Sequence, residues 1–170
     1  MQRWRLVFGL PLVLLVTSCG GGGALSPRYG FAAQVVAGQA DRTVEATKAA
    51  GFGWLTQQVR WDGLQPAANA TIDWSQLDTA ADASSRAGIK MMFSIVAAPQ
   101  WAANPNSQFP KNPDDFSAFL QAMVGHFKGR VQAYEIWNEE NFATEVGPGN
   151  INAGQYVELL KAAYQTIKAI

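Results

Sequence analysis

A chain of 170 residues with 48% hydrophobic and 15% charged residues can form a folded domain with a core, and this composition excludes an intrinsically disordered protein. The thirteen basic and thirteen acidic residues give a formal net charge of zero, and no cluster of Lys and Arg follows the first few residues, so nothing indicates a nucleic-acid partner. Six Trp residues are many for this length, and their rings stack well on flat apolar surfaces such as the faces of sugar rings.

Residues 1–18 have the pattern of a bacterial lipoprotein signal peptide. Arg3 and Arg5 form a basic start, and the apolar run from Leu6 to Val16 is too short to span a bilayer comfortably. The run leads into Val16-Thr17-Ser18-Cys19, which resembles a lipobox, and Cys19 is the only cysteine of the chain. We therefore expect cleavage before Cys19 and lipidation of that residue. An ordinary secretory signal with an incidental cysteine is the alternative.

A lipidated Cys19 predicts a location in the cell envelope, facing the periplasm or the exterior, with the membrane reached through the lipid anchor only. Residues 19–28 include four consecutive glycines and are predicted to form a flexible tether. The folded domain is then expected over residues 29–170. A single cysteine excludes an internal disulfide, even in an oxidising compartment.

Strand and helix patterns alternate after the tether. Strands are predicted near residues 30–36, 54–60, 89–96 and 131–138, and the third is the near-continuous apolar run typical of a parallel strand covered on both faces. Helices are predicted near residues 41–50, 74–87, 113–128 and 153–170. Their expected ends include the N-caps Asp41 and Asn112 and the terminating glycines Gly51, Gly88 and Gly129.

This alternation predicts a parallel sheet, either doubly wound or closed as a barrel. The segment Val36-Ala37-Gly38-Gln39-Ala40 lacks the glycine spacing of a phosphate-binding loop, which argues against a dinucleotide fold. Polar and aromatic residues follow three of the strands, where a barrel builds its active site: Arg60-Trp61, Pro99-Gln100-Trp101 and Asn138-Glu139.

We therefore predict an α/β fold of the (β/α)₈ TIM-barrel class, of which the first four βα units are present. A complete barrel of this class has about 250 residues. A fragment or a truncated gene product is expected on this basis, and a half-barrel that pairs with a second copy is the alternative.

One motif gives the prediction a function. Trp137-Asn138-Glu139 at the end of the fourth predicted strand resembles the Trp-Asn-Glu-Pro motif of clan A glycoside hydrolases. Val59-Arg60-Trp61 and Ala98-Pro99-Gln100-Trp101-Ala102 resemble segments after the second and third strands of family 39 and cellulase-like members. The resemblance implies that Glu139 is the general acid/base of a retaining enzyme and that Asn138 hydrogen-bonds the sugar 2-hydroxyl. Glu140 stands where the family has proline.

The chemistry of glycoside hydrolysis is consistent with that assignment. It needs one carboxylic acid to protonate the leaving oxygen and, in retaining enzymes, a second carboxylate as nucleophile about 5–5.5 Å away. Strand alternation puts Glu135, Trp137 and Glu139 on one face, although Glu139 lies just past the strand end, where it can escape that parity. Ile136 and Trp137 are expected to supply an apolar wall. The alternative for Glu139 is a solvated loop carboxylate, a description that suits Glu140 better.

The other candidates are substrate-binding residues. The resemblance implies that Arg60 hydrogen-bonds the nucleophile, and an ion pair with Glu135 inside the barrel is its alternative. Trp101 and Trp137 are expected to contact sugar, with loop packing as the alternative for Trp101. The lone histidine, His126, is expected on a helix surface. No spacing of His, Cys, Asp and Glu predicts a metal site, and no cofactor is expected.

The resemblance places the nucleophile at the end of a seventh strand, so no residue of this chain is assigned that role. The leading hypothesis is the N-terminal half of a lipid-anchored glycoside hydrolase whose partner is a β-linked poly- or oligosaccharide. A non-catalytic carbohydrate-binding lipoprotein is the second hypothesis. An unrelated barrel enzyme with a chance Asn-Glu pair is the third.

Overall fold

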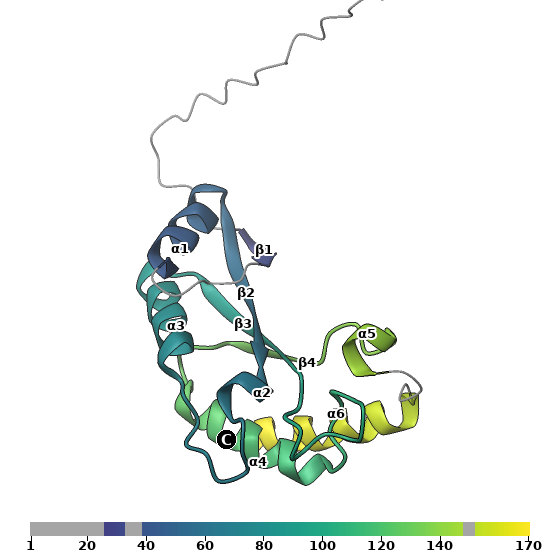
Figure 1. Cartoon of the computed structure of the whole chain (residues 1–170). Coiled ribbons are helices and arrows are strands. Elements are labelled where there is room, and N and C mark those ends of the chain that lie inside the picture. Colours follow the sequence, from purple (N-terminus) through teal and green to yellow (C-terminus); the bar gives the residue numbers. More distant parts are fainter. Residues whose placement is uncertain (1–25, 33–38, 148–151) are drawn as a thin grey trace, which may run out of the picture.

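The computed structural model describes residues 26–32, 39–147 and 152–170 (Figure 1). The predicted signal peptide and Cys19 lie outside these residues. The described strands form one parallel sheet in the order β1-β2-β3-β4, as the alternating pattern predicts. Their bounds are β1 Ser26–Ala32, β2 Phe52–Arg60, β3 Lys90–Val96 and β4 Ala133–Ile136.

The described helices are α1 Ala40–Ala49, α2 Trp61–Leu64, α3 Ser75–Ala87, α4 Pro113–His126, α5 Ala143–Val146 and α6 Ala153–Lys168. Figure 1 shows α1, α3 and α4 on one side of the sheet, with α6 beside α4. None of these helices is long and apolar enough to cross a membrane. The short helices α2 and α5 follow β2 and β4, at the end of the sheet toward which the strand arrows point.

Two predicted boundaries at the start of the domain differ from the structure. The first strand begins at Ser26, not near residue 30, because Ser26 pairs with Phe52 at the start of β2, so residues 26–28 belong to the sheet. Asp41 is not the N-cap of α1: the helix begins one residue earlier, and the backbone carbonyl of Gln39 accepts hydrogen bonds from Thr43. Asp41 lies instead in the first turn, where a carboxylate favours the helix dipole.

The sheet has one face under the helices and one face without helices among the described residues. Along β2, Leu55, Gln57 and Val59 are buried, whereas Thr56 and Gln58 between them are half-buried, which is the alternation of a two-faced strand. Gly30 of β1 is required at its position, because a Cβ there would lie 2.6 Å from the Cβ of Trp54.

Large aromatic side chains fill the helix-covered core. Phe93 of β3 packs edge-on against Phe127 at the end of α4, with ring centroids 5.0 Å apart. Trp61 is fully buried and stacks on Phe119 of α4, also at 5.0 Å. Burial of each such ring contributes about 1.5–3 kcal/mol to stability.

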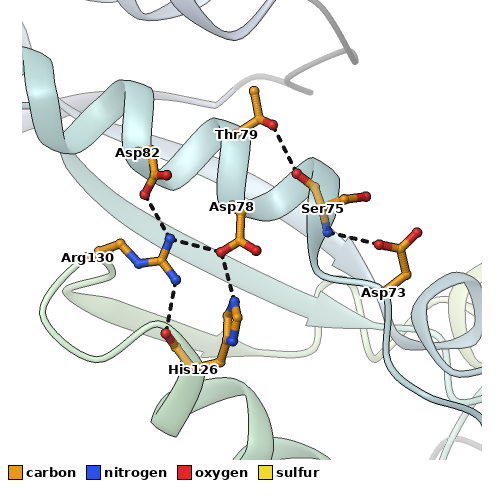
Figure 2. Close-up of polar contacts among 7 residues, drawn as sticks. All are labelled: Asp73, Ser75, Asp78, Thr79, Asp82, His126 and Arg130. Atoms are coloured by element: carbon orange, nitrogen blue, oxygen red, sulfur yellow. Dashed lines mark hydrogen bonds and ion pairs between the residues drawn. The ribbon is translucent and has the colours of Figure 1, made fainter.

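Polar contacts join α3 to the end of α4 on the outer surface (Figure 2). Arg130 Nη1 lies 2.9 Å from Asp78 Oδ1 and 2.8 Å from Asp82 Oδ1, and Nη2 donates to the carbonyl of His126. Asp78 Oδ1 also lies 2.8 Å from His126 Nε2. His126 is thus a helix-end residue with a structural partner, as the sequence predicts. We call Asp78, Asp82, His126 and Arg130 the α3–α4 polar cluster.

The helix ends follow simple capping chemistry. Asn112 Oδ1 accepts from the backbone N–H of Asp114 at 3.0 Å, and Pro113 occupies the first position of α4, as predicted. Gly88 ends α3 with a left-handed φ of +72°, also as predicted. At the start of α3, Asp73 accepts from the N–H of Ser75, and the hydrogen bonds from Ser75 lower the pKa of this carboxyl (Figure 2).

Candidate functional site

The predicted catalytic and substrate-binding residues all lie at the carboxyl ends of β2, β3 and β4. Arg60 ends β2, Trp101 lies in the loop after β3, and Trp137, Asn138 and Glu139 directly follow β4. Neighbouring parallel strands end at one edge of a sheet, so the fold brings these residues to the same end. The polar side chains Gln58, Ser94 and Glu135 are also in register there.

The chain makes an unusual turn after β4. The strand ends at Ile136, and both Trp137 (φ +65°) and Glu139 (φ +53°) adopt left-handed backbone conformations that side chains disfavour by about 1–2 kcal/mol. The N–H of Trp137 donates to the carbonyl of Ile95, and the carbonyl of Glu139 accepts from the N–H of Phe142. These hydrogen bonds hold the turn at both sides.

The turn changes which way the side chains face. The expectation that Trp137 shares a face with Glu135 is wrong, because Ile136 and Trp137 are buried in succession while Glu135 is exposed. The left-handed backbone at Trp137 ends the strand alternation at Ile136, two residues before the predicted strand end at Asn138. The Trp137 ring packs against Phe109 at 5.0 Å and Phe116 at 6.3 Å.

The Glu and Asn of the motif remain accessible. The side chain of Glu139 is exposed and that of Asn138 is half-buried, whereas Trp137 is only 2% exposed. Asn138 and Glu139 therefore reach the solvent in the described part of the chain. Trp137 is buried and packs the turn against Phe109 and Phe116.

Arg60 forms an ion pair with Asp62, not with Glu135, which was the alternative expected from the sequence. Its guanidinium donates to Asp62 through Nε at 3.1 Å and Nη2 at 2.8 Å, a two-point contact between exposed side chains. The alternative pairing with Glu135 is therefore corrected: the observed partner is Asp62. Arg60 Nη2 also lies 3.4 Å from Gln108 Oε1, which links the end of β2 to the loop after β3.

The tryptophans that follow β2 and β3 differ in burial. Trp61 is fully buried and donates from Nε1 to Gln65 Oε1 at 3.0 Å. Trp101 is half-buried, donates from Nε1 to the carbonyl of Gln65 at 3.1 Å, and meets Trp61 edge-on at 5.5 Å. Loop packing thus accounts for one edge of Trp101, and the residue is half-buried against the core.

Tyr156 is a residue of this region that the sequence did not single out as functional. Its hydroxyl donates to the carbonyl of Ile136 at 3.0 Å, at the point where β4 gives way to the turn. Burial, followed by the nearby carboxylates of Glu140 and Glu135, raises the pKa of Tyr156, so the phenol stays protonated and keeps donating. A tyrosine on the apolar face of a helix needs a partner for its hydroxyl, and that need was the available signal.

Among the described residues, no group of three or more His, Cys, Asp and Glu side chains is placed to hold a metal ion. The chemistry available at this end of the sheet is that of carboxylates, amides, a guanidinium and an indole.

The fold is shared with glycoside hydrolases of known structure. A family 39 glycoside hydrolase from Bacteroides cellulosilyticus superposes with a TM-score of 0.68 at 22% identity over 82% of this chain and 29% of that one. A β-xylosidase from Caulobacter crescentus superposes with a TM-score of 0.64 at 19% identity, over 82% of this chain and 33% of its own. The endoglucanase of Thermotoga maritima superposes with a TM-score of 0.59 at 20% identity, over 76% of this chain and 40% of its own.

These similarities confirm the resemblance to clan A glycoside hydrolases at the level of the fold. No protein-family model and no curated protein matches the chain. The chain spans about a third of the length of the first two of these structures. Its α/β fold therefore resembles part of the fold of these clan A TIM-barrel structures.

Proposed function

We propose that this chain is the N-terminal half of a retaining glycoside hydrolase barrel, with Glu139 as general acid/base. The observation that carries the proposal is the placement of Asn138 and Glu139. They are accessible, directly follow β4, and lie at the carboxyl end of a parallel sheet whose fold matches barrel glycoside hydrolases. In barrel enzymes that end of the strands carries the chemistry.

In the proposed reaction, Glu139 donates its proton to the glycosidic oxygen as the bond to the anomeric carbon breaks. A second carboxylate attacks that carbon and forms a glycosyl-enzyme. Glu139, now ionised, then takes a proton from the water that hydrolyses this intermediate. The Asn138 amide is proposed to hydrogen-bond the sugar 2-hydroxyl, and Arg60 is proposed to orient the second carboxylate. No residue of the four described strands is assigned as that second carboxylate.

The substrate is proposed to be a β-linked poly- or oligosaccharide, because the similar structures include a β-xylosidase and endoglucanases. The half-buried ring of Trp101 is the proposed stacking surface for a sugar ring. The described strands and helices are proposed to be the first four βα units of a (β/α)₈ barrel.

The test compares leaving groups in the full-length protein. Glu139→Gln is expected to lower kcat/KM for xylobiose or cellobiose by roughly 10²–10⁴-fold, because their leaving oxygen needs a proton. The kcat/KM of Glu139→Gln for a dinitrophenyl glycoside should fall much less, since this leaving group departs without protonation. Glu140→Gln is the matched control and should leave both rates nearly unchanged. Full hydrolysis of xylobiose and cellobiose by Glu139→Gln would refute the assignment.

Attachment to the membrane is a separate proposal that rests on Cys19 and the apolar segment before it. Wild-type protein expressed in a bacterium with labelled palmitate should carry the label and sediment with membranes. Cys19→Ser should do neither. A labelled Cys19→Ser protein would exclude lipidation at this residue.

A carbohydrate-binding lipoprotein without turnover is the second candidate. The accessible Trp101 and Asn138 favour it, since they can hold a sugar without a second carboxylate. Binding of oligosaccharides that survives Glu139→Gln, with no hydrolysis by the full-length wild type, would favour this candidate over the enzyme.

A further inference from the structure

The loop after β3 forms an open hollow beside the strand ends. The loop runs through residues 97–112 before α4 begins, and together with Ala143 and Gly147 it surrounds a cavity of about 740 Å³. A volume of this order accommodates one or two sugar rings.

Backbone and side-chain hydrogen bonds fix the shape of this loop. Asn104 donates from its backbone N–H to the carbonyl of Phe109 and from Nδ2 to that of Pro110 at 3.3 Å. Ser107 Oγ accepts from the N–H of Phe109 at 2.9 Å and donates to the carbonyl of Val146. The hollow therefore has walls that are held in place before a ligand arrives.

The described lining is rich in hydrogen-bonding groups and has a single charge. No Asp or Glu is among these residues, and Lys111 is the one cation. The polar side chains are Gln100, Asn104, Asn106, Ser107, Gln108 and Lys111. Amides and a hydroxyl suit the hydroxyl groups of a sugar, and an ammonium group adds attraction for an anion.

Lys111 is held in position without being neutralised. Its Nζ donates to the carbonyl of Trp101 at 2.8 Å, and no ion pair joins it to a carboxylate within the described ranges. Lys161, by contrast, pairs with Glu158, and Arg60 pairs with Asp62. An ammonium group has three donors, so Lys111 can still donate to a ligand.

The hollow adjoins the candidate site through two residues. Gln108 lines the hollow, and its Oε1 accepts from Arg60 at the end of β2. Trp101, whose carbonyl anchors Lys111, is the proposed stacking surface. A saccharide bound at the strand ends would thus extend into the hollow.

We propose that this hollow is a subsite for a sugar unit that bears a carboxylate, with Lys111 pairing with the carboxylate and the amides with the hydroxyls. The inference rests on the proposed function and narrows its substrate class to saccharides that contain uronic acid. The acidic unit occupies the hollow while the neighbouring linkage lies over Asn138 and Glu139.

The test is a binding measurement on the full-length protein, so it does not depend on turnover. Methyl β-glucuronide and methyl β-glucoside differ only at C6, and each is titrated while NMR follows the backbone amides of residues 99–111. The glucuronide should bind about fivefold more tightly. The preference should shrink when the salt concentration rises from about 0.05 M to about 0.5 M.

Lys111→Met keeps the aliphatic chain and should bring the two affinities together, whereas Lys111→Arg should retain the preference. Lys48→Met on α1 is the matched control for a general change of charge and should behave as wild type. Equal affinities in the wild type, no binding of either sugar, or a preference that survives Lys111→Met would overturn the subsite. None of these results decides whether Glu139→Gln abolishes hydrolysis, so the two proposals fail separately.

Discussion

The two ends of the sheet use left-handed backbone in different ways. Where helices lead back into strands, the left-handed residues are the glycines Gly51, Gly88 and Gly129. Where strands lead into helices, the left-handed residues that the structure describes are Ala97, Asn106, Trp137 and Glu139, all of which carry side chains, and Gly147 after α5; the connection from β1 to α1 lies outside the described residues.

The contrast indicates what each end is for. Glycine adopts a positive φ without steric cost, whereas another residue loses about 1–2 kcal/mol in this conformation. The turns that contain glycine therefore carry less steric strain than the turns at the strand ends. The strand-end turn keeps Glu139 despite the cost, which is understandable if its carboxylate is needed there, and strain of this kind gathers at functional sites.

The largest expected effect tests whether the strand-end loops depend on close contact. Gly147→Ala would bring a Cβ into the backbone carbonyl of Asn106 and to 2.9 Å from the Cα of Ser107, at a φ of +92°. Neither neighbour is a flexible side chain. We expect a loss of about 3 kcal/mol or more in the free energy of unfolding, measured in urea. A loss below about 1 kcal/mol would show that the loop moves away freely.

Sequence alone predicted one end of the molecule better than the other. Gly51 and Gly88 follow the helices α1 and α3 as predicted, because glycine adopts a positive φ readily, and Asn112 with Pro113 begins α4 as predicted. Gly129 also has a positive φ, but α4 already ends at His126, three residues before the predicted terminator. The residue types of Trp137 and Glu139 do not predict a positive φ. The motif predicts a site at this end of the sheet, while the burial of Trp137 and the Arg60–Asp62 pair required the three-dimensional structure.

Gly88→Ala is the matched substitution at the other end. Nothing lies within 4 Å of the added Cβ, so only the left-handed conformation at φ +72° is penalised. We expect a loss of about 1–2 kcal/mol in the free energy of unfolding. Gly88→Asn should lose less, because asparagine tolerates this conformation better. Losses equal to that of Gly147→Ala would remove the distinction between the two ends.

Alkaline pH probes the helix-covered layer. Burial raises the pKa of Tyr134, beside Phe93, to about 12. The unfolded chain ionises near pH 10, so the stability contributed by this group is complete below about pH 10 and is lost as the pH rises toward 12. We expect a loss on the order of 1 kcal/mol, allowing for partial exposure, by urea unfolding across that range. Tyr134→Phe should flatten the curve there, and an unchanged curve would contradict the assignment.

Arg130→Met removes the centre of the α3–α4 polar cluster (Figure 2). The neighbouring carboxylates, Asp82 first, raise the pKa of Arg130, which stays charged. Because its partners are partly exposed, we expect a loss of only about 0.5–1 kcal/mol in unfolding free energy, smaller still in high salt. Lys161→Met, which removes a fully surface pair, should cost less. An Arg130→Met protein with altered hydrolysis would mean that this outer surface is coupled to the strand ends.

The smallest expected effect has the opposite sign. Glu139→Asn replaces a residue at φ +53° with one that adopts this conformation readily, and the exposed Glu139 side chain forms no ion pair with another described residue. We therefore expect a gain of about 0.5 kcal/mol in unfolding free energy together with loss of the acid/base function. Glu140→Asn, at an ordinary backbone conformation, should show no gain. Stabilisation with inactivation at Glu139 alone would mean that the turn is strained in order to keep a carboxylate, whereas destabilisation by Glu139→Asn would mean that the carboxylate itself holds the turn.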